Sequence, residues 1–440
     1  MYRISVVGCG FVGLCLAVVS ANRGAKVIAV DIDESKVNKI KFGDPTFYEP
    51  GLKELLKQAL KENLTITADT NFAIKHSDIT FVTVGTPSNP DGSVNLEYVK
   101  SAVKTIAESL RDKKEHHIVV IKSTVIPTTT TSIIKPLLER ESGKMVTDGI
   151  GLIMNPEFLR EGSAIYDTEN PHLIVIGSNE KKSSDILESF YRDMYGKNIP
   201  EIIRTTLESA ELIKYANNSF LATKISFINT IANICQNISD IDVKTIAYAI
   251  GKDPRIGPLF LQAGAGYGGS CFPKDVNAFI NFSRKIGYEP LLINATQQVN
   301  ELQPTRVLEL IKKEIGPIEN KKIAVLGLSF KKDTDDIRES VSIKLVNHLL
   351  ENGAIVSAHD PMAIENSKKI FGNKITYYND INGCIDNADC CVIMTDWDAY
   401  KTMKEEIFYN MKQRVIVDAR RILDATKFKN NIRFIAIGMN

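Results

Sequence analysis

Short β-rich runs alternate with longer helical patterns along the first half of the chain. Residues 3–7 form a first apolar run, a helical pattern continues to about Asn22, and a second run covers residues 26–30. Further strands are predicted at residues 79–84, 117–121, 151–154, 173–176 and 201–204, with helices between them such as 95–110 and 183–195. Strands that alternate with helices in this way predict a parallel sheet covered by helices.

The middle of the chain carries one uninterrupted helical pattern. Residues 206–239 contain no glycine or proline, and Leu, Ile, Ala and Phe recur along them. This stretch predicts a single helix of more than about 30 residues. Further helices are expected to about Ile315, where Gly316-Pro317 and the charged residues 319–322 mark a linker.

A second alternation of strands and helices follows this linker. Strands are expected at residues 323–326, 355–358, 390–394 and 415–417, and a helix from about Ser340. We therefore predict an α/β protein with two Rossmann-like doubly wound domains, joined by a long central helix and a small all-α domain. The predicted domains cover residues 1–205, 206–317 and 318–440.

Composition and charge narrow the class of protein. The 440 residues carry a formal net charge of +1, so no overall field attracts nucleic acid or an acidic membrane. The seven cysteines form no C-x-x-C pair and the six histidines have no metal-ligand spacing, which argues against a disulfide framework and a bound metal. No apolar run approaches the ~18 residues of a membrane span, and the N-terminus lacks the basic start of a signal peptide. We expect a cytoplasmic protein.

The turn after the first strand contains a G-x-G-x-x-G motif made by Gly8, Gly10 and Gly13. Such glycines permit a tight turn, close approach of a pyrophosphate and close packing of helix on strand. Asp31 ends the second strand, where it would accept hydrogen bonds from ribose hydroxyls and repel a 2′-phosphate, which favours NAD over NADP. The nearby Lys36 would tolerate such a phosphate. The alternative is a glycine-rich turn in an α/β domain that binds no ligand.

Polar or basic residues follow several other predicted strands. Thr86 and Thr124 lie in such loops, and ligands of α/β sheets bind beyond the carboxyl ends of the strands, although ordinary turn chemistry explains either loop equally well. In the second α/β unit, four basic residues at strand ends suit a diphosphate, although scattered surface cations are commoner: Lys331, Lys332, Arg338 and Arg420. This unit lacks a full G-x-G-x-x-G, so a second dinucleotide is not implied.

A glycine-rich loop at residues 264–269 leads directly to Cys271. Pro273 suits the first turn of a helix, so Cys271 is expected at or just before a helix N-terminus. That position lowers the pKa of a thiol, and a thiolate beside a flexible loop suggests covalent catalysis. Asp275, four residues on, would lie near the same helix face. The alternative is a tight turn with a buried, inert thiol.

Two further pairs of polar residues have helical spacing. Glu157 and Glu161 are four residues apart and, if their segment is helical, both carboxylates share one face, where they could position water or accept a proton. Lys214 and Asn218 are four apart on the long helix and could stabilise an oxyanion. Solvated surface charges explain either pair equally well or better on spacing alone.

Three motifs, in order along nearly the whole chain, resemble a known family. They are Gly268-Gly269-Ser270-Cys271-Phe272-Pro273-Lys274-Asp275, residues 155–164, and Phe330-Lys331-Lys332-Asp333-Thr334 with Arg338-Glu339-Ser340. Together they resemble the nucleotide-sugar 6-dehydrogenases, the UDP-glucose/GDP-mannose dehydrogenase family. One peripheral segment departs from the family pattern, because Pro171-His172-Leu173 stands where the family often has Pro-Asp-Arg.

The resemblance implies a four-electron oxidation of a sugar C6 alcohol, with NAD as cofactor. Cys271 would hold the aldehyde as a thiohemiacetal and then as a thioester, which water hydrolyses to the uronic acid. Lys214 and Asn218 would stabilise the oxyanions, while Asp275 and Glu157 would orient water and move protons. By the same resemblance Thr124 would hold that water.

The resemblance also assigns binding residues, domain roles and a partner. Cofactor contacts would be Gly8, Gly10, Val12, Gly13, Asp31, Lys36, Thr86, Thr124, Glu161, Lys274 and Arg338. Nucleotide-sugar contacts would be Phe158, Leu159, Glu161, Lys214, Arg255, Phe260, Gly268, Phe330, Lys331 and Arg420. The three domains would bind NAD, carry the cysteine loop with a dimer interface, and bind the UDP-sugar. Arg255 resembles a residue that reaches into the neighbouring subunit's site, which implies a homodimer or a higher homo-oligomer.

The identity of the sugar stays open within this family. The Gly-Ser after Glu161 favours UDP-glucose, but GDP-mannose or a UDP-N-acetylhexosamine would undergo the same chemistry. A two-electron hydroxyacid dehydrogenase would need no nucleophilic cysteine. An inactive NAD-binding regulator would not need Cys271, Lys214, Asn218 and Asp275 together.

Overall fold

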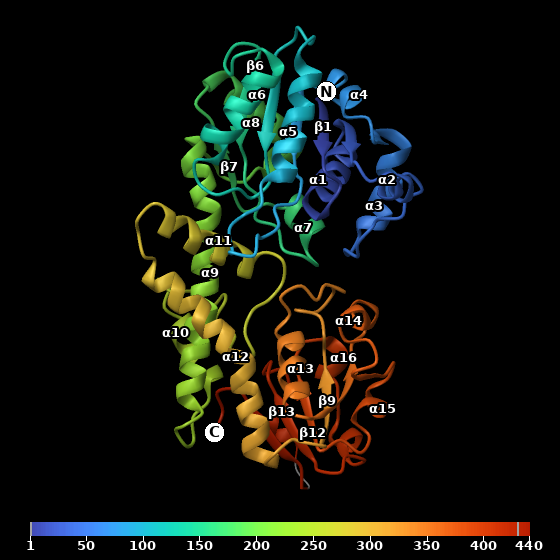
Figure 1. The fold of residues 1–440 in the computed structure, drawn as a ribbon, viewed down its shortest axis with the longest axis vertical. Helices are drawn as coiled ribbons and strands as arrows, with labels where there is room; N and C mark the ends of the chain where they lie inside the picture. Colours follow the sequence, from blue (N-terminus) through green and yellow to red (C-terminus); the bar gives the residue numbers. More distant parts are fainter. Residues whose placement is uncertain (1, 429–430) are drawn as a thin grey trace. The chain divides into compact units, whose positions relative to one another are not determined.

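The computed structural model describes residues 2–428 and 431–440 of the chain (Figure 1). The chain folds into two compact units, divided between Asn217 and Asn218. Each unit is built on its own sheet. The long helix α9 (Leu207–Cys235) begins in the first unit and continues into the second.

The sheet of the first unit has the strand order β3-β2-β1-β4-β5-β6-β7-β8. Among the described residues its neighbouring strands run parallel, apart from the antiparallel pair β6 and β7. The order reverses between β1 and β4, which is the point where such sheets bind ligands. The strands are β1 (Arg3–Val7), β2 (Lys26–Val30), β3 (Leu64–Thr67), β4 (Ile79–Val82), β5 (His117–Ile121), β6 (Ile150–Met154), β7 (Ile174–Gly177) and β8 (Ile202–Thr205).

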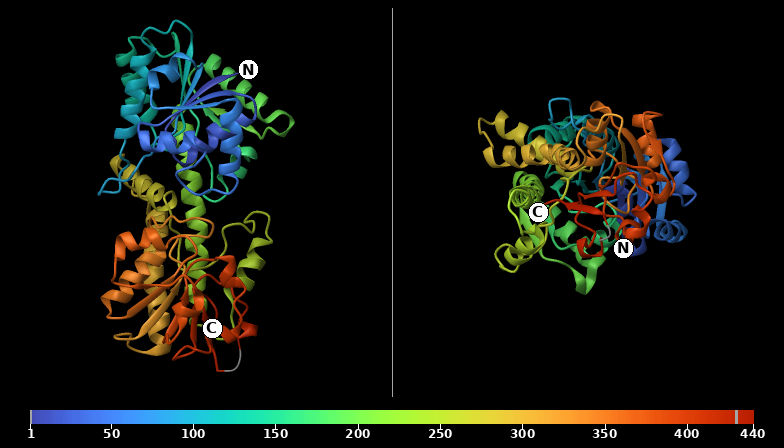
Figure 2. Two further views of the ribbon diagram at one scale, coloured as in Figure 1. Left: turned by 90° about the vertical axis from the view of Figure 1, so that its right-hand side faces the viewer. Right: turned by 90° about the horizontal axis from the view of Figure 1, so that it is seen from below.

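Successive side chains of these strands pack into two hydrophobic cores, one on each face of the sheet. In β5, Ile118 and Val120 belong to one core, and Val119 and Ile121 to the other. Burial on both faces explains why the strands are continuous apolar runs in the sequence. The helices α1 (Phe11–Asn22), α2 (Glu34–Lys41), α3 (Leu52–Glu62), α7 (Ala164–Glu169) and α8 (Lys181–Tyr195) contribute to the first core, and α4 (Thr70–Lys75), α5 (Glu97–Leu110), η1 (Thr130–Ile134) and α6 (Lys135–Ser142) to the second (Figure 2).

The second unit combines a parallel sheet, which has its own helices, with a separate group of helices. Its sheet has the order β11-β10-β9-β12-β13-β14, which repeats the reversal seen in the first unit. The strands are β9 (Lys322–Leu326), β10 (Ile355–His359), β11 (Thr376–Tyr377), β12 (Cys390–Ile393), β13 (Val415–Asp418) and β14 (Arg433–Ala436). The helices of the sheet are α13 (Val341–Glu351), α14 (Ile364–Phe371), α15 (Ile381–Ile385) and α16 (Asp398–Lys401). The other four are the end of α9, α10 (Val243–Gly251), α11 (Phe272–Lys285) and α12 (Leu291–Ile315).

The predicted α/β class with two doubly wound sheets and a helical region is confirmed, with three local corrections. Helix α9 has 29 residues and stops at Cys235 rather than near Ser239, because the following residues turn, with Asp240 at a positive φ of 60°. Lys322, predicted to lie in the linker, is the first residue of β9. Residues 155–161 form no helix.

Within residues 2–428 and 431–440, no helix has the length and apolar character required to cross a bilayer. In the same part of the chain, no group of three or more His, Cys, Asp or Glu side chains is arranged to hold a metal ion.

Candidate active site

The turn between β1 and α1 depends on its glycines. Gly8 has a φ of 105°, and its N–H donates to Val30 O at 2.8 Å. A Cβ on Gly13 would lie 1.9 Å from Gly8 O, so only glycine lets α1 pack this closely on the turn. A Cβ on Gly10, the N-cap of α1, would meet nothing within 4 Å. The loop is therefore tight on its inner side and open at the helix N-terminus, which suits a pyrophosphate.

Asp31 lies next to this turn at the end of β2. Its Oδ2 accepts from Cys9 N and its Oδ1 from Asp33 N, both at 3.0 Å, and the residue is 9% exposed. The carboxylate is thus fixed where the motif requires an acceptor for ribose hydroxyls. Lys36, on α2, is half-buried, and Thr86, after β4, is buried. These residues fit a dinucleotide with an unphosphorylated ribose.

Glu157 and Lys214 form a buried ion pair in the first unit. Lys214 Nζ donates to Glu157 Oε1 at 2.9 Å and to Glu157 O at 2.6 Å. Lys214 is 3% exposed, and its Nζ lies 5.5 Å from the centre of the Phe158 ring. A solvated surface lysine is therefore excluded. The contact places an amine and a carboxylate, two groups that can exchange a proton, side by side in a buried site.

The segment that carries Glu157 is irregular, which corrects the helical premise for Glu157 and Glu161. Pro156 disfavours a helical conformation of Asn155. Glu157 Oε2 then accepts from Leu159 N at 2.6 Å, so the side chain closes a local turn instead of leaving its backbone to a helix. Glu161 is half-buried. Its assigned contacts with NAD and sugar, like that of Leu159 with the sugar, stay predictions.

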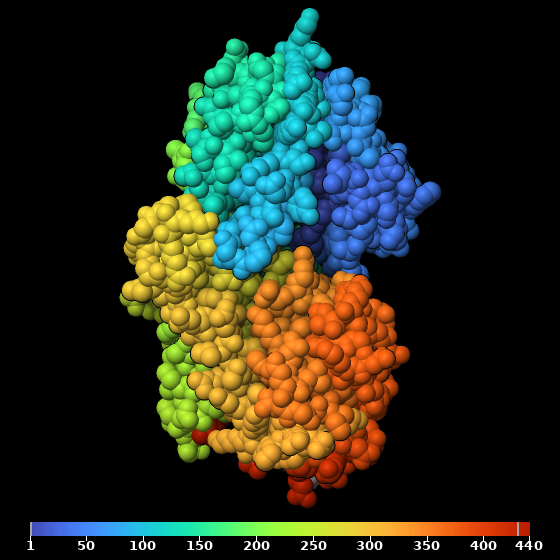
Figure 3. All heavy atoms as spheres, in the orientation of Figure 1, coloured from blue at the N-terminus to red at the C-terminus, as the bar shows by residue number. Residues whose placement is uncertain are grey.

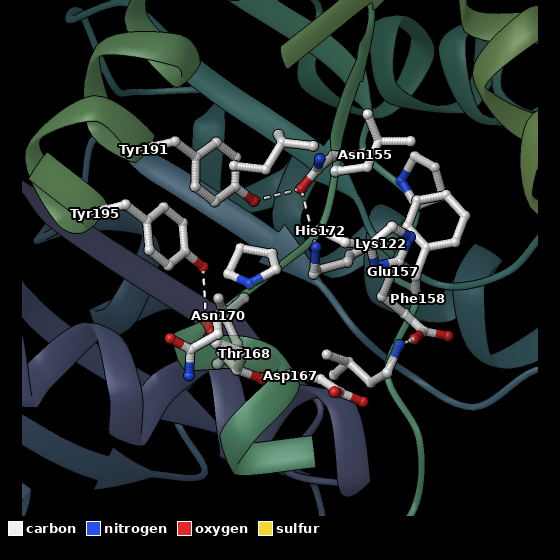
Figure 4. A pocket seen from close by; sticks show the side chains of 16 residues that line it. Lys122, Asn155, Glu157, Phe158, Asp167, Thr168, Asn170, His172, Tyr191 and Tyr195 are labelled. Carbon is white, nitrogen blue, oxygen red and sulfur yellow. Dashed lines mark hydrogen bonds between the residues drawn. The ribbon is translucent and has the colours of Figure 1, made fainter. Parts of the chain in front are cut away.

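A second lysine lies close to this pair, and the sequence analysis did not single it out. Lys122 Nζ donates to Asn155 Oδ1 at 3.0 Å, and Tyr191 OH donates to the same oxygen at 2.5 Å (Figure 4). These residues line a pocket with Glu157 and Phe158. Burial lowers the pKa of Lys122 to about 8. The position of Lys122 at the end of β5 was the only signal available in the sequence.

Cys271 is the N-cap residue of α11 and is exposed, whereas Cys9, Cys15, Cys235, Cys384, Cys390 and Cys391 are buried. Its Sγ lies 3.7 Å from Ser270 Oγ, and Pro273 stands in the first turn of the helix. The alternative of a buried, inert thiol is therefore wrong. An accessible thiol at a helix N-terminus is placed for nucleophilic attack.

Asp275 and Asn218 form a second buried contact, in the second unit. Asn218 Nδ2 donates to Asp275 Oδ2 at 2.7 Å, and Lys274 Nζ pairs with Asp275 Oδ1 at 2.6 Å. Asp275 N donates to Cys271 O at 2.9 Å, which continues α11 from the cysteine. Asp275 is 1% and Asn218 4% exposed. Lys214 and Asn218, four residues apart on α9, each hold a carboxylate.

The glycine loop before Cys271 packs on the segment that follows β9. A Cβ on Gly268 would lie 2.3 Å from Glu339 O, and one on Gly269 would lie 2.6 Å from the Phe330 ring. Gly269 N donates to Arg338 O at 2.9 Å. These close approaches leave no room for a side chain at either position, which explains why both residues are glycine. They also join two of the three sequence motifs, which sequence spacing alone does not reveal.

The remaining basic and aromatic candidate residues each make different contacts within the protein. Arg420 donates to Met394 O and to Gly266 O, and the second bond holds the glycine loop in place. Burial lowers the pKa of Arg420. Arg255 is exposed and pairs with Asp253, and Arg338 pairs with Asp336. Lys331 Nζ lies 5.6 Å from the Phe330 ring centre, and Phe260 packs edge-on to Phe272. Val12 and Thr124 are half-buried. Their ligand contacts stay predictions.

Comparisons with known proteins match the order of these features. Three models of the UDP-glucose/GDP-mannose dehydrogenase family match the chain: the NAD binding domain at residues 2–195, the central domain at 208–302 and the UDP binding domain at 324–425. The UDP-glucose 6-dehydrogenase TuaD of Bacillus subtilis is 42% identical over 96% of this chain and 90% of its own length.

Solved structures show the same likeness. A UDP-glucose dehydrogenase from Pyrobaculum islandicum has a TM-score of 0.92 at 36% identity, covering 100% of this chain and 98% of that one. A UDP-D-ManNAc dehydrogenase from Pyrococcus horikoshii has a TM-score of 0.87 at 26% identity, covering 99% of each chain. The chain belongs to the UDP-glucose/GDP-mannose dehydrogenase family.

Proposed function

We propose that the protein oxidises UDP-glucose to UDP-glucuronate in two NAD-dependent steps. The observation that carries this proposal is the exposed Cys271 at the N-terminus of α11, on a glycine loop followed by the buried Asp275. A dehydrogenase that removes only two electrons needs no such nucleophile. The names of the relatives with the higher identities support UDP-glucose as the sugar nucleotide.

Each step of the proposed reaction balances in atoms and electrons. NAD, when bound, accepts one hydride from the sugar C6 in each of the two oxidations. In the first oxidation the C6 hydroxyl also gives its proton to a base, which leaves an aldehyde. The Cys271 thiolate adds to the aldehyde carbon, and the second hydride transfer converts this thiohemiacetal to a thioester. Water then attacks the thioester carbon and gives up its two protons to neighbouring bases and solvent, which releases the carboxylate and returns the sulfur of Cys271 to thiolate.

The buried polar contacts support separate roles for the remaining residues. Lys214 would assist the transfer of the hydroxyl proton, because Glu157 Oε1 holds its Nζ in place at 2.9 Å. Lys214 and the amide N–H of Asn218 would stabilise the oxyanions. Asp275 and Glu157 would orient the attacking water, with Thr124 as a further partner. Asn218 and Lys274 fix Asp275 by contacts of 2.7 and 2.6 Å.

The division into an NAD-binding domain (residues 1–205), a central helical domain (206–317) and a UDP-sugar domain (318–440) is part of the same proposal. We also place the protein in the cytoplasm. In the part of the chain that the structure describes, none of the seven cysteines forms a disulfide, which suits a reducing compartment.

We further propose a homodimer built through α9. Phe220, Phe227 and Ile234 are 65%, 51% and 51% exposed and recur every seven residues, which places an apolar stripe along one side of the helix. The first turn of α12 (yellow in Figure 3) adds Leu291 and Leu292, which are 75% and 68% exposed. In such a dimer the exposed Arg255 would contact the substrate of the partner subunit.

The test is a panel of nucleotide sugars with NADH counted per sugar consumed. We expect UDP-glucose to give two NADH and one UDP-glucuronate. Turnover of GDP-mannose or of a UDP-N-acetylhexosamine instead, again with two NADH, would change the substrate but keep the chemistry. One NADH per sugar, with an aldehyde as the final product, would contradict the proposal.

A further inference from the structure

The turn after β9 has the same backbone geometry as the turn after β1 that begins the G-x-G-x-x-G motif. Gly8 and Gly327 have φ values of 105° and 101°, and each donates its N–H at 2.8 Å to the last residue of the neighbouring strand, β2 or β10. Asp31 follows β2 and Asp360 follows β10, and each acid accepts from the residue after the glycine. In both sheets the strand order reverses beside this turn, where α/β sheets bind ligands.

The two acids differ in the donors that they hold. Among the described residues, Asp31 accepts from the N–H groups of Cys9 and Asp33. Asp360 is 2% exposed, and its two oxygens accept from Leu328 N at 2.7 Å, Ser329 N at 3.0 Å, Ser329 Oγ at 3.1 Å, Trp397 Nε1 at 3.2 Å, and Met362 N and Ala363 N at 2.8 Å each. A carboxylate offers about four lone-pair positions, so these donors fill Asp360 and leave no acceptor for a ribose hydroxyl. The acid therefore serves the protein itself rather than a second dinucleotide.

Side chains bond every backbone polar group of Leu328 and Ser329, the two residues that follow Gly327. Asp360 accepts from both N–H groups. Ser340 Oγ donates to Leu328 O at 2.8 Å, and Thr395 Oγ1 donates to Ser329 O at 2.7 Å. Leu328 and Ser329 are both 0% exposed, and a buried segment outside helices and strands must satisfy its backbone groups in this way. The turn is therefore fixed from both sides.

This turn leads directly to Phe330 and Lys331, the two candidate contacts of the nucleotide sugar in the same segment. Phe330 N donates to Asp336 O at 3.1 Å, and the Phe330 ring lies where a Cβ on Gly269 would approach it to 2.6 Å. Lys331 Nζ lies 5.6 Å from the centre of that ring. Because both residues continue the chain from the turn, a shift of the turn would displace both side chains together.

We propose that Asp360, together with Ser340 and Thr395, positions the turn that presents Phe330 and Lys331 to the nucleoside diphosphate of the substrate. Asp360 is a positioning residue, because it acts through the turn and not by touching the ligand. A turn that is already ordered in the free protein saves the entropy that binding would otherwise lose, and so lowers the Kd. The inference rests on the proposed function in taking Phe330 and Lys331 as nucleotide-sugar contacts.

The direct test is the Kd of UDP, and of GDP in parallel, measured by calorimetry for Asp360→Asn. Asparagine has the same size, but its amide nitrogen is a donor and would face N–H groups that lose their acceptor. We expect the Kd of the nucleotide that the wild type binds to rise at least about tenfold, with the Kd of NAD unchanged. Equal nucleotide affinities in Asp360→Asn and the wild type would overturn the proposal.

Asp389→Asn is the matched control. Asp389 is also 2% exposed, and its Oδ2 accepts from the N–H of Lys322 at 3.0 Å. It holds the first residue of β9, whereas Asp360 holds the turn after the last, so the control tests the same substitution at the opposite end of the same strand. The nucleotide Kd of this variant should equal that of the wild type. An equal loss of affinity in both variants would show a general loss of stability and would overturn the proposal.

A second variant covers the case in which Asp360→Asn does not fold. Thr395→Val keeps the shape of the side chain and removes only the hydroxyl that donates to Ser329 O. It should also raise the nucleotide Kd, and a wild-type Kd would overturn the proposal. In the enzymatic reaction, either variant should raise KM for the sugar nucleotide and leave kcat within about twofold, whereas a lower kcat at unchanged KM would contradict a role in binding.

Failure of this inference can be told apart from failure of the proposed function. The nucleotide Kd does not depend on turnover, so the comparison of variants stands whatever the panel of nucleotide sugars yields. A wild type that binds GDP and not UDP would contradict UDP-glucose as the substrate, and the same variants would then test the role of Asp360 with GDP.

Discussion

Replacing Lys122 by methionine should change how the free energy of unfolding depends on pH. The pKa of Lys122 is lowered from 10.5 to about 8 in the folded protein, mainly by burial. The unfolded chain therefore binds more protons than the folded one between these two pH values. In this window the free energy of unfolding of the wild type rises with pH. The reason is that unfolding takes up a proton, which becomes less favourable as the pH rises.

The size of this effect follows from the same two values. The difference between 10.5 and about 8, at ~1.4 kcal/mol per pH unit, corresponds to about 3 kcal/mol. Most of this rise falls between pH 7 and 10. Methionine has a similar length and no charge, so Lys122→Met should lack this rise. The difference in the free energy of unfolding, variant minus wild type, should therefore be larger at pH 7 than at pH 10 by roughly 2–3 kcal/mol.

The assay is urea unfolding at pH 7 to 10, followed by circular dichroism. The fluorescence of Trp397, the single tryptophan, reports on the second unit separately. Tyr191→Phe is the control: it should lose about 1 kcal/mol at every pH, because it removes one hydrogen bond without changing a charge that titrates in this range. A difference between Lys122→Met and the wild type that is the same at pH 7 and pH 10 would refute the assignment of a buried, titrating ammonium group.

Three further substitutions test the site. Gly13→Ala should abolish NAD binding measured by calorimetry, because the added Cβ would lie 1.9 Å from Gly8 O, and unchanged affinity would argue against the glycine turn as the cofactor site. Cys271→Ala should stop UDP-glucuronate formation in a coupled assay while NAD still binds; normal turnover would remove Cys271 from the reaction. Arg255→Ala should raise KM for the sugar nucleotide several-fold if the partner subunit completes the site, whereas normal kinetics would indicate a self-contained protomer.

Local motifs explain why much of the site could be predicted from the sequence. The turn from Gly8 to Gly13 is formed by residues that are close in the sequence, and its close contacts require glycine. The placement of Cys271 follows from Pro273, which suits the start of a helix. Lys214 and Asn218 share a helix, so their spacing was informative. The sheets could be predicted because their strands are buried on both faces and read as apolar runs.

Contacts between distant parts of the chain explain what could not be predicted. The partners of Lys214 and Asn218 are Glu157 and Asp275, and no spacing rule joins them. The helical premise for Glu157 and Glu161 was wrong because a carboxylate competed for the backbone of its own turn. Lys122 was not singled out because its burial and its contact with Asn155 arise only in the tertiary structure.

The central claim is that Cys271 holds the sugar between the two oxidations. It is tested most directly by the mass of the peptide that contains Cys271, after Asp275→Asn protein is mixed with UDP-glucose and NAD and quenched in acid. Because Asp275 is proposed to orient the hydrolytic water, this variant should accumulate the thioester. We expect that peptide to gain the mass of a UDP-glucuronyl group, and to lose it when hydroxylamine is added. An unmodified Cys271 peptide, in protein that still forms two NADH per sugar, would contradict the account.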